Sequence, residues 1–356
     1  PPRGKLIASY RGRLVIARTP DDPHNYYMSR IGEPEDWEYF PVFPSISQAL
    51  AGTTVRAGKS PDVVNALIPY NDDLMLLGGD HSILRMTGDP ASGGQIDTIT
   101  TSVGIAYGKS WCMGPDGALY FMSPVGRMYI MEPGGMPQEL SNAHIDHRLR
   151  SVDLNLYAPH LIYSQLQNGL HVFLLPREVL NGAASPLCFF WERDTAAWWV
   201  DSYHEDRTPC SVVGIDGMRP DDRAILTSDH LGRLFRIHPD KNRDFDKKIQ
   251  SHVVIPIAEQ QDTELTSTKI TGVYTVMGAD TEDASIALQQ RNDITDEADP
   301  AQSTPTVVGP GRSDKLGLRA KGNFLELKIA NESETGYWSV EELRVDVAQS
   351  GRRRND

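Results

Sequence analysis

Pairs of short apolar segments joined by tight polar turns recur along this chain. In the clearest copy, residues 118–122 and 128–131 are joined by residues 123–127, and neither arm alternates apolar with polar side chains. A short segment that is apolar throughout predicts a strand covered on both faces. Gly, Pro, Asn and Asp punctuate the joins, and these residues supply the tight turns that paired strands need.

The same hairpin is repeated at four other places. Residues 224–237 keep its form, and both copies carry a Gly-Arg pair before the second strand, Gly126-Arg127 and Gly232-Arg233. Looser copies occupy three further segments: residues 5–17 (followed by 26–29), 74–86 and 161–174. The first strands begin near Leu14, Leu74, Leu119, Leu161 and Ala224. This spacing is an imperfect period near 50 residues.

Repeats of this length that hold several short strands are typical of β-propeller blades, each of which buries its faces only against its neighbours. We therefore predict an all-β protein with a propeller of five to seven blades. A further hairpin, residues 187–191 with 196–200, is predicted to form the outer arms of the fourth blade, with its aromatic side chains packing across strands. The best helical signal, residues 176–182, predicts one turn at most.

The pattern changes after residue 250. Blades are predicted over residues 1–250, and residues 251–350 are predicted to complete the last blade or to form a small appended antiparallel sheet. Residues 324–329 and 340–347 alternate apolar with polar side chains, which predicts antiparallel strands with one wet face. Three polar segments are expected outside the sheets: a hairpin tip at 280–283 between strands 270–276 and 285–289, an exposed acidic loop at 293–314, and a basic tail at 351–356.

Composition indicates a soluble globular protein. The 356 residues are 39% hydrophobic and 23% charged, and no run approaches the roughly 18 apolar residues of a membrane span. The N-terminus lacks the apolar core of a signal peptide and an initiator Met, so N-terminal residues are expected to be missing or removed. The net charge of -13 disfavours a protein that grips nucleic-acid phosphates over a wide face.

Candidate chemical groups are few. Cys112, Cys188 and Cys210 are odd in number and lack metal-type spacing, which predicts buried reduced thiols. His144, Asp146 and His147 suggest either a metal site or a polar turn; the turn is favoured because His147 would lie on the opposite face of a strand. The carboxylates of Asp293, Asp296, Glu297 and Asp299 lack EF-hand spacing and are expected to be solvated. Arg352, Arg353 and Arg354 would either grip an acidic groove or DNA phosphates, or form a free terminus.

No signature of an enzyme stands out in the sequence. A Gly-x-Ser-x-Gly elbow, a P-loop and a dinucleotide fingerprint are all lacking at strand-to-helix junctions, and so are the Ser-x-Asp-x-Gly-x-Thr-Trp turns of sialidase propellers. The sequence leaves open a pair of carboxylates for glycoside hydrolysis, because such a pair can converge from distant strands. We therefore predict a protein that is not an enzyme, with no catalytic, cofactor-binding or metal residues and no cofactor.

Several phrases resemble a known family. Residues 4–37 contain "YRGRLVIA" and "YYMSRIGEPEDW", and residues 66–90, 102–131 and 319–354 add "ALIPYNDDLMLLGGDHSILRMTGDP", "SVGIAYGKSWCMGPDGALYFMSPVGRMYIM" and "RAKGNFLELKIANESETGYWSVEELRVDVAQSGRRR". These phrases are similar to the blades and the ending of β-propeller virion proteins from the neck and tail of tailed bacteriophages. The chain resembles in particular the nozzle proteins of short-tailed phages, although it is much shorter and has no large inserted platform domain.

The resemblance implies a structural virion protein in the phage tail or neck. It would form a homo-oligomeric ring, expected to be a hexamer, that contacts tail adaptor or portal-proximal proteins and tail fibres and encloses or gates the DNA exit channel. Acidic subunits would give a negative lumen along which DNA slides without specific binding. The chain is shorter than nozzle proteins and lacks their platform domain. A second interpretation is therefore another ring or stopper protein of the head-to-tail junction.

Two alternatives belong to other classes. A tail-associated glycan-binding or glycan-hydrolysing propeller would bring Asp and Glu from several blades around a central pocket. A cellular propeller scaffold that binds peptides is weaker, because the repeats lack Trp-Asp and kelch signatures.

Overall fold

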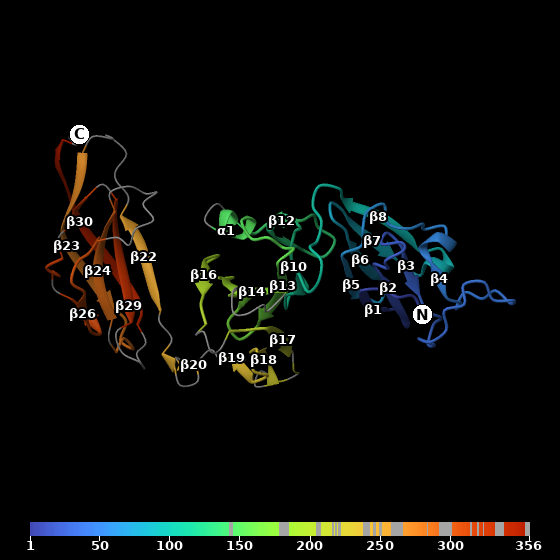
Figure 1. The fold of residues 1–356 in the computed structure, drawn as a ribbon. Helices are drawn as coiled ribbons and strands as arrows, with labels where there is room; N and C mark the ends of the chain where they lie inside the picture. The colour runs from blue at the N-terminus through green and yellow to red at the C-terminus, as the bar shows by residue number, and fades with distance from the viewer. Residues whose placement is uncertain are drawn as a thin grey trace. The chain divides into compact units, whose positions relative to one another are not determined.

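The computed structural model describes residues 1–352, except 142–144, 178–184, 204–207, 216, 218, 220–221, 238–242, 245–246, 249–250, 258–265, 283, 292–300, 314, 319, 323 and 332–337. The fold is all-β, as predicted, and the described elements include one short α-helix, α1 (Asp146–Arg150). The chain divides into two compact units, Pro1–Pro239 and Asp240–Asp356. Strands of both units are labelled in Figure 1. The predicted helical turn at 176–182 falls mostly outside the described residues, and Pro176 ends a strand.

The first unit contains five antiparallel sheets, numbered here in chain order. Sheet 1 holds β1 (Leu6–Tyr10), β2 (Arg13–Ala17), β3 (Tyr26–Met28) and β4 (Leu50–Ala51). Sheet 2 holds β5 (Ala66–Asn71), β6 (Leu74–Gly78), β7 (Ile83–Thr87) and β8 (Gln95–Thr100). Sheet 3 holds β9 (Trp111–Met113), β10 (Leu119–Met122), β11 (Met128–Met131) and β12 (Gln138–Glu139). Sheet 4 holds β13 (Tyr157–Ser164), β14 (Gly169–Pro176), β15 (Leu187–Glu192) and β16 (Trp198–Asp201), and sheet 5 holds β17 (Ser211–Ile215), β18 (Ala224–Ser228) and β19 (Leu234–Ile237).

Each sheet is an antiparallel meander in which consecutive strands are neighbours. All five predicted hairpins are present, and each lies in a different sheet. The predicted outer arms of the fourth repeat are β15 and β16, where Trp191 faces Trp198 across the strands. Short 3-10 helices at Gly52–Thr54 and Pro90–Ser92 lie in the connections.

Neighbouring sheets bury each other's faces. On β6, Met75 and Leu77 pack into a core shared with sheet 1, whereas Leu76 packs into a core shared with sheet 3. Side chains alternate between the two faces of a strand, so a strand covered on both sides is apolar at every position. Two further cores join sheet 3 to sheet 4 and sheet 4 to sheet 5. This explains the continuous apolar arms of the hairpins.

The recurring Gly-Arg pair marks the end of a hairpin turn. Gly12, Gly126 and Gly232 have φ values of 71°, 82° and 77°, in the left-handed region that favours glycine. In the first hairpin Arg11 also has a positive φ, 50°, and Tyr10 pairs with Arg13. Two consecutive residues with positive φ fit a two-residue type I′ turn, whose twist matches that of the flanking strands.

The second unit is built from two antiparallel sheets around one core. The first contains β22 (His252–Ile257), β24 (Ala284–Arg291), β25 (Ala301–Gln302), β26 (Thr306–Val308) and β29 (Phe324–Asn331). The second contains β23 (Thr266–Met277), β27 (Gly311–Arg312), β28 (Ala320–Gly322) and β30 (Val340–Arg352). Ile270 of β23 packs in the same core as Ile286 of β24 and Leu327 of β29. A small ribbon, β20 (Arg243–Asp244) with β21 (Lys247–Lys248), precedes them.

Several expectations for the second unit need correction. Residues 280–282 do not form the tip of a hairpin, because β23 and β24 belong to different sheets, and residue 283 lies outside the described residues. Residues 251–350 were expected to complete the last blade or to form one small appended sheet, but the described strands there form two sheets. The described part of the acidic segment, residues 301–313, contributes β25, β26 and β27, and Val308 is buried. The tail begins later than expected, because Gly351 and Arg352 extend β30. The alternation predicted for a strand with one wet face is present in β29, where residues 325–329 alternate between buried and half-buried. The described side chains of β30 do not alternate in this way.

None of the helices in the described ranges combines the length and the apolar character needed to cross a membrane.

Candidate functional site

The residues that the sequence singled out as a possible metal site are not gathered in one. His144 lies outside the described residues, and His147 is exposed on α1. Asp146 also lies on α1 and forms ion pairs with Arg127 (Nε to Oδ1, 3.5 Å) and Arg150 (Nη1 to Oδ2, 3.4 Å). Within the described ranges, no group of three or more His, Cys, Asp or Glu side chains is placed to hold a metal ion.

The remaining sequence candidates are dispersed. Asp293, Asp296, Glu297 and Asp299 lie outside the described residues, as do Arg353 and Arg354, whereas Arg352 ends β30. All three cysteines are free thiols; Cys188 is buried, and Cys112 and Cys210 are half-buried. Burial raises the pKa of the Cys188 thiol, which keeps it protonated and unreactive.

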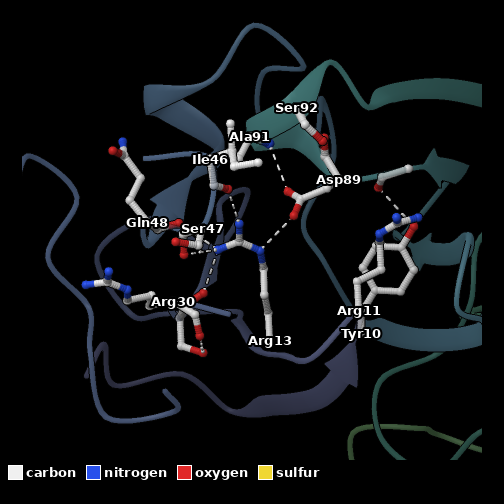
Figure 2. A network of polar contacts seen from close by, with 12 residues as sticks. Tyr10, Arg11, Arg13, Arg30, Ile46, Ser47, Gln48, Asp89, Ala91 and Ser92 are labelled. Atoms are coloured by element: carbon white, nitrogen blue, oxygen red, sulfur yellow. Dashed lines mark hydrogen bonds and ion pairs between the residues drawn. The ribbon is translucent and has the colours of Figure 1, made fainter. Parts of the chain in front are cut away.

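A buried arginine at the start of β2 organises one end of the first unit. Arg13 is 1% exposed, and Figure 2 shows its guanidinium surrounded by oxygen atoms. Its Nε donates to Asp89 Oδ2 at 3.0 Å. The other nitrogens donate to backbone carbonyls of Ser29 (2.8 Å), Gln48 (2.6 Å) and Ile46 (2.9 Å). A buried cation is tolerated when it is paired and its donors are satisfied, as they are here.

The partner carboxylate belongs to the neighbouring sheet. Asp89 follows β7 and is 7% exposed. Its second oxygen accepts from the Ala91 N–H at 2.9 Å, which caps the 3-10 helix Pro90–Ser92. Arg13 therefore ties together β2, the connection between β7 and β8 of sheet 2, and the loop that contains Ile46 and Gln48.

That loop exposes an unusual number of large apolar side chains. It connects β3 to β4, and we call residues 39–46 the apolar loop; Figure 1 shows it as a projecting blue segment. Phe40 is 79% exposed, Val42 86%, Phe43 86% and Ile46 71%. Single exposed apolar residues are common on protein surfaces, but contiguous groups mark interaction sites.

The base of the apolar loop is fixed on both sides. Before it, Arg30 pairs with Asp36 (Nη1 to Oδ2, 3.4 Å), and the Arg30 N–H donates to the Asp36 carbonyl at 3.0 Å. After it, Arg13 holds the carbonyls of Ile46 and Gln48. Pro41 and Pro44 restrict the backbone in between. The apolar side chains are thus presented from a constrained support, which lowers the entropy cost of binding through them.

A second feature is a cavity of about 470 Å³ in the first unit. Its lining comes from the first strand of every sheet and from the segment before β9: Lys5, Leu6, Ile7, Ala66, Leu67, Tyr107, Gly108, Lys109, Trp111, His160, Leu161, Ile162, Val212, Val213 and Gly214. The first strands of the five sheets therefore converge on one space. The volume lies within the range of small-molecule sites, roughly 300 to 1,000 Å³.

The cavity is positively charged although the protein is acidic. Lys5 and Lys109 line it, and no described carboxylate does. Arg18 and Arg177 lie over the ring of Tyr107, 4.5 and 5.9 Å from its centroid. Burial lowers the pKa of His160, and the positive charges of Lys109 and Arg177 lower it further, whereas a hydrogen bond with the Val212 backbone acts in the opposite direction. The net lowering keeps the imidazole neutral in the absence of an anion.

A smaller cavity of about 240 Å³ lies beside the first and shares Leu161, Ile162 and Gly214 with it. Its other lining residues include Gln165, Gln167 and Arg223. Among the described residues that line either cavity there is no Asp or Glu, so neither lining supplies the carboxylate pair that glycoside hydrolysis uses.

Sequence reasoning missed both the apolar loop and the larger cavity, although the sequence carries a signal for the loop. Residues 39–46 place four large apolar side chains around two prolines with no strand period, which indicates an exposed apolar loop. In the sequence, Arg13 stands out only as the residue that follows the turn glycine of the first hairpin. The cationic cavity had no readable signal, because Lys5, Lys109 and His160 lie far apart in the sequence and converge only through the fold.

Comparisons with known proteins do not assign the chain. No protein-family model matches it, and no curated protein matches it. Among solved structures, it is similar to the extracellular domain of a one-component system from B. thetaiotaomicron, with 12% identity and a TM-score of 0.34. That match covers 64% of this chain and 26% of the other, so the chain spans about a quarter of the length of that protein. At this identity and TM-score the similarity carries no argument about function.

Proposed function

We propose that the first unit is a five-bladed propeller and that the chain is a structural subunit of a phage tail or neck, which assembles into a ring around the DNA exit channel. The blade count rests on five sheets whose first strands line one cavity. The phage setting rests on the sequence resemblance. The subunit acts by assembly rather than by catalysis, and its net charge of -13 would give the channel a repulsive wall for DNA.

The observation that carries the assembly role is the apolar loop. Two Phe, one Val and one Ile are held in water on a constrained support, and burying each would contribute about 1.5 to 3 kcal/mol. Glu33, Glu35 and Glu38 precede these side chains and are exposed, so an anionic lipid surface is a poor match. A protein surface fits better, and in a ring this surface belongs to the next copy of the chain.

Self-association of the full chain tests this role. Sedimentation velocity should show a concentration-dependent ring, and the double substitution Phe40→Ser/Phe43→Ser should weaken it by at least about a hundredfold, because two large apolar contacts are lost. The matched control is Leu156→Ser, which removes another exposed apolar side chain outside the apolar loop.

Two outcomes would count against the proposal. One is a chain that stays monomeric at all concentrations and is not found in purified virions by electron microscopy. The other is a ring that Leu156→Ser weakens as much as the double substitution does. A ring found around the tail axis of virions would support both the assembly and its location.

The rival function, a glycan-binding propeller, is favoured by one observation: an open cavity with Trp111 and Tyr107 in its lining. Aromatic rings of this kind pack against apolar faces of ligands. Incubation of the full chain with a neutral host-surface polysaccharide separates the rivals, since binding or release of reducing ends is expected only from the glycan protein.

A further inference from the structure

The strongest unexplained feature is the positive charge of the larger cavity, which has a volume of about 470 Å³. The chain carries 48 acidic and 35 basic side chains, so a random surface would hold more carboxylates than ammonium groups. The described lining instead has Lys5 and Lys109 with no carboxylate. Neither lysine has an ion-pair partner among the described residues, whereas Lys59, elsewhere in the same unit, pairs with Asp22 at 3.4 Å.

The surroundings of these lysines reinforce the charge. Arg18 and Arg177 lie over Tyr107, which is itself part of the lining. Arg18 also donates to Asn65, and Arg177 Nε donates to the Leu154 carbonyl at 3.3 Å, so the partners of both guanidiniums among the described residues are neutral groups. Cations that are paired only with neutral oxygens and a ring keep their charge available to a ligand.

His160 supplies a group that can respond to an anion. It lines the cavity beside Lys109, with which its backbone forms a parallel bridge. Its Nδ1 atom is buried and has no hydrogen-bond partner within the part of the chain that the structure describes. The Nδ1 atom is closed off from solvent, so an anion in the cavity would act on the imidazole through its charge rather than by a hydrogen bond to this atom.

We propose that the cavity binds a small anionic molecule, whose carboxylate or phosphate group is received by Lys5 and Lys109 near His160. The lysine ammonium groups provide charge and hydrogen-bond donors, and the nearby imidazole responds to the charge of the bound anion. The apolar wall of Leu67, Ile162 and Val213 packs against the remainder of the ligand. This site is independent of ring assembly, because none of its residues belongs to the apolar loop.

Two sources share this chemistry: a phosphate group and the carboxylate of an acidic sugar. Calorimetric titration of the full chain with inorganic phosphate, D-glucuronate and D-glucose distinguishes them. Binding of phosphate, of glucuronate or of both is expected, with no binding of glucose, and raising the salt concentration to about 0.5 M should weaken it. The proposal is overturned if neither anion binds, or if glucose binds as well as glucuronate does.

Substitution locates the site. Lys5→Gln/Lys109→Gln should weaken anion binding by at least about tenfold, since two charges are lost, and should leave thermal unfolding unchanged because both lysines are exposed. Lys59→Gln is the matched control and should bind as the unchanged chain does. Equal weakening by both variants would refute the assignment of the site to this cavity.

A third measurement needs no variant of the lysines. NMR titration of the His160 imidazole should show its pKa rise when the anion is bound, because the added negative charge opposes Lys109 and Arg177. A bound anion that leaves the His160 resonance and its pKa unchanged would place the ligand elsewhere and overturn the proposal.

Discussion

At the scale of single residues, Arg13 shows how a buried charge can fix a loop. Its guanidinium meets one carboxylate and four backbone carbonyls, those of Ser29, Ile46, Ser47 and Gln48. Removing a partner from such a group leaves the remaining charge uncompensated, which costs more than the pair itself contributes.

Arg13→Met should therefore destabilise the first unit by about 3 to 5 kcal/mol, since Asp89 would stay buried without its partner. Arg127→Met is the matched control: it occupies the same place after a turn glycine, but its side chain is 33% exposed. We expect the control to cost less than about 1 kcal/mol. Urea unfolding measures both, and equal costs would contradict the argument.

Asp201, at the end of β16, predicts a pH dependence of stability. Burial raises its pKa from 3.8 to about 6. The folded chain then binds a proton that the unfolded chain releases, so its stability falls as pH rises from about 4 to about 6 and is level above. Asp201→Asn should raise the unfolding free energy at pH 7.5 by about 2 to 3 kcal/mol, a gain that shrinks to nothing below about pH 3.5.

The gain is measured as the difference in unfolding free energy between Asp201→Asn and the unchanged chain at each pH. This difference is needed because the contribution of His171 to stability changes with pH in the opposite direction. Burial lowers the pKa of His171 to about 4, so its own contribution is lost as pH falls from about 6.5 to about 4. A difference between Asp201→Asn and the unchanged chain that stays constant across pH would contradict the prediction.

At the scale of elements, the turn glycines separate two costs of a side chain. Gly126 and Gly232 have similar φ values, but their surroundings differ. A Cβ on Gly126 would lie 2.7 Å from the Leu149 carbonyl oxygen, whereas a Cβ on Gly232 would have no described atom within 4 Å. Gly232→Ala should cost about 1 to 2 kcal/mol from backbone strain alone. Gly126→Ala should cost clearly more in thermal unfolding; similar losses would show that α1 moves aside freely.

Elements were predictable where local chemistry decides the pairing. The hairpins of the first unit follow from arms that are apolar at every position and from turn residues such as Gly126 and Gly232. Residues 280–282 carry an equally polar turn signal, yet the chain there crosses from one sheet to the other. A turn signal says where a strand ends, but the choice of partner for β23, which is β30, depends on contacts far along the chain.

At the scale of the whole molecule, the shared cores couple neighbouring sheets. Phe121 of β10 packs in the core that sheets 2 and 3 share. Phe121→Ala should destabilise the first unit by about 3 to 5 kcal/mol and should speed hydrogen exchange in both sheets. Exchange that rises in sheet 3 alone would show that the sheets are independent.

The candidate sites belong to this scale too, which is why sequence reasoning did not find the cavity. Lys5, Lys109 and His160 belong to three repeats, and nothing in any one repeat indicates that they meet. The apolar loop is different, because its composition is local and could be read from residues 39–46 alone.

The shared cores run in series, from sheet 1 to sheet 5, and no core among the described residues joins the last sheet to the first. Ile7 on sheet 1 and Leu234 on sheet 5 are 68% and 67% exposed. In the proposed propeller, the junction between sheet 5 and sheet 1 would therefore be the weakest, so fraying and proteolytic nicking should start at sheet 5, whose core among the described residues is the smallest.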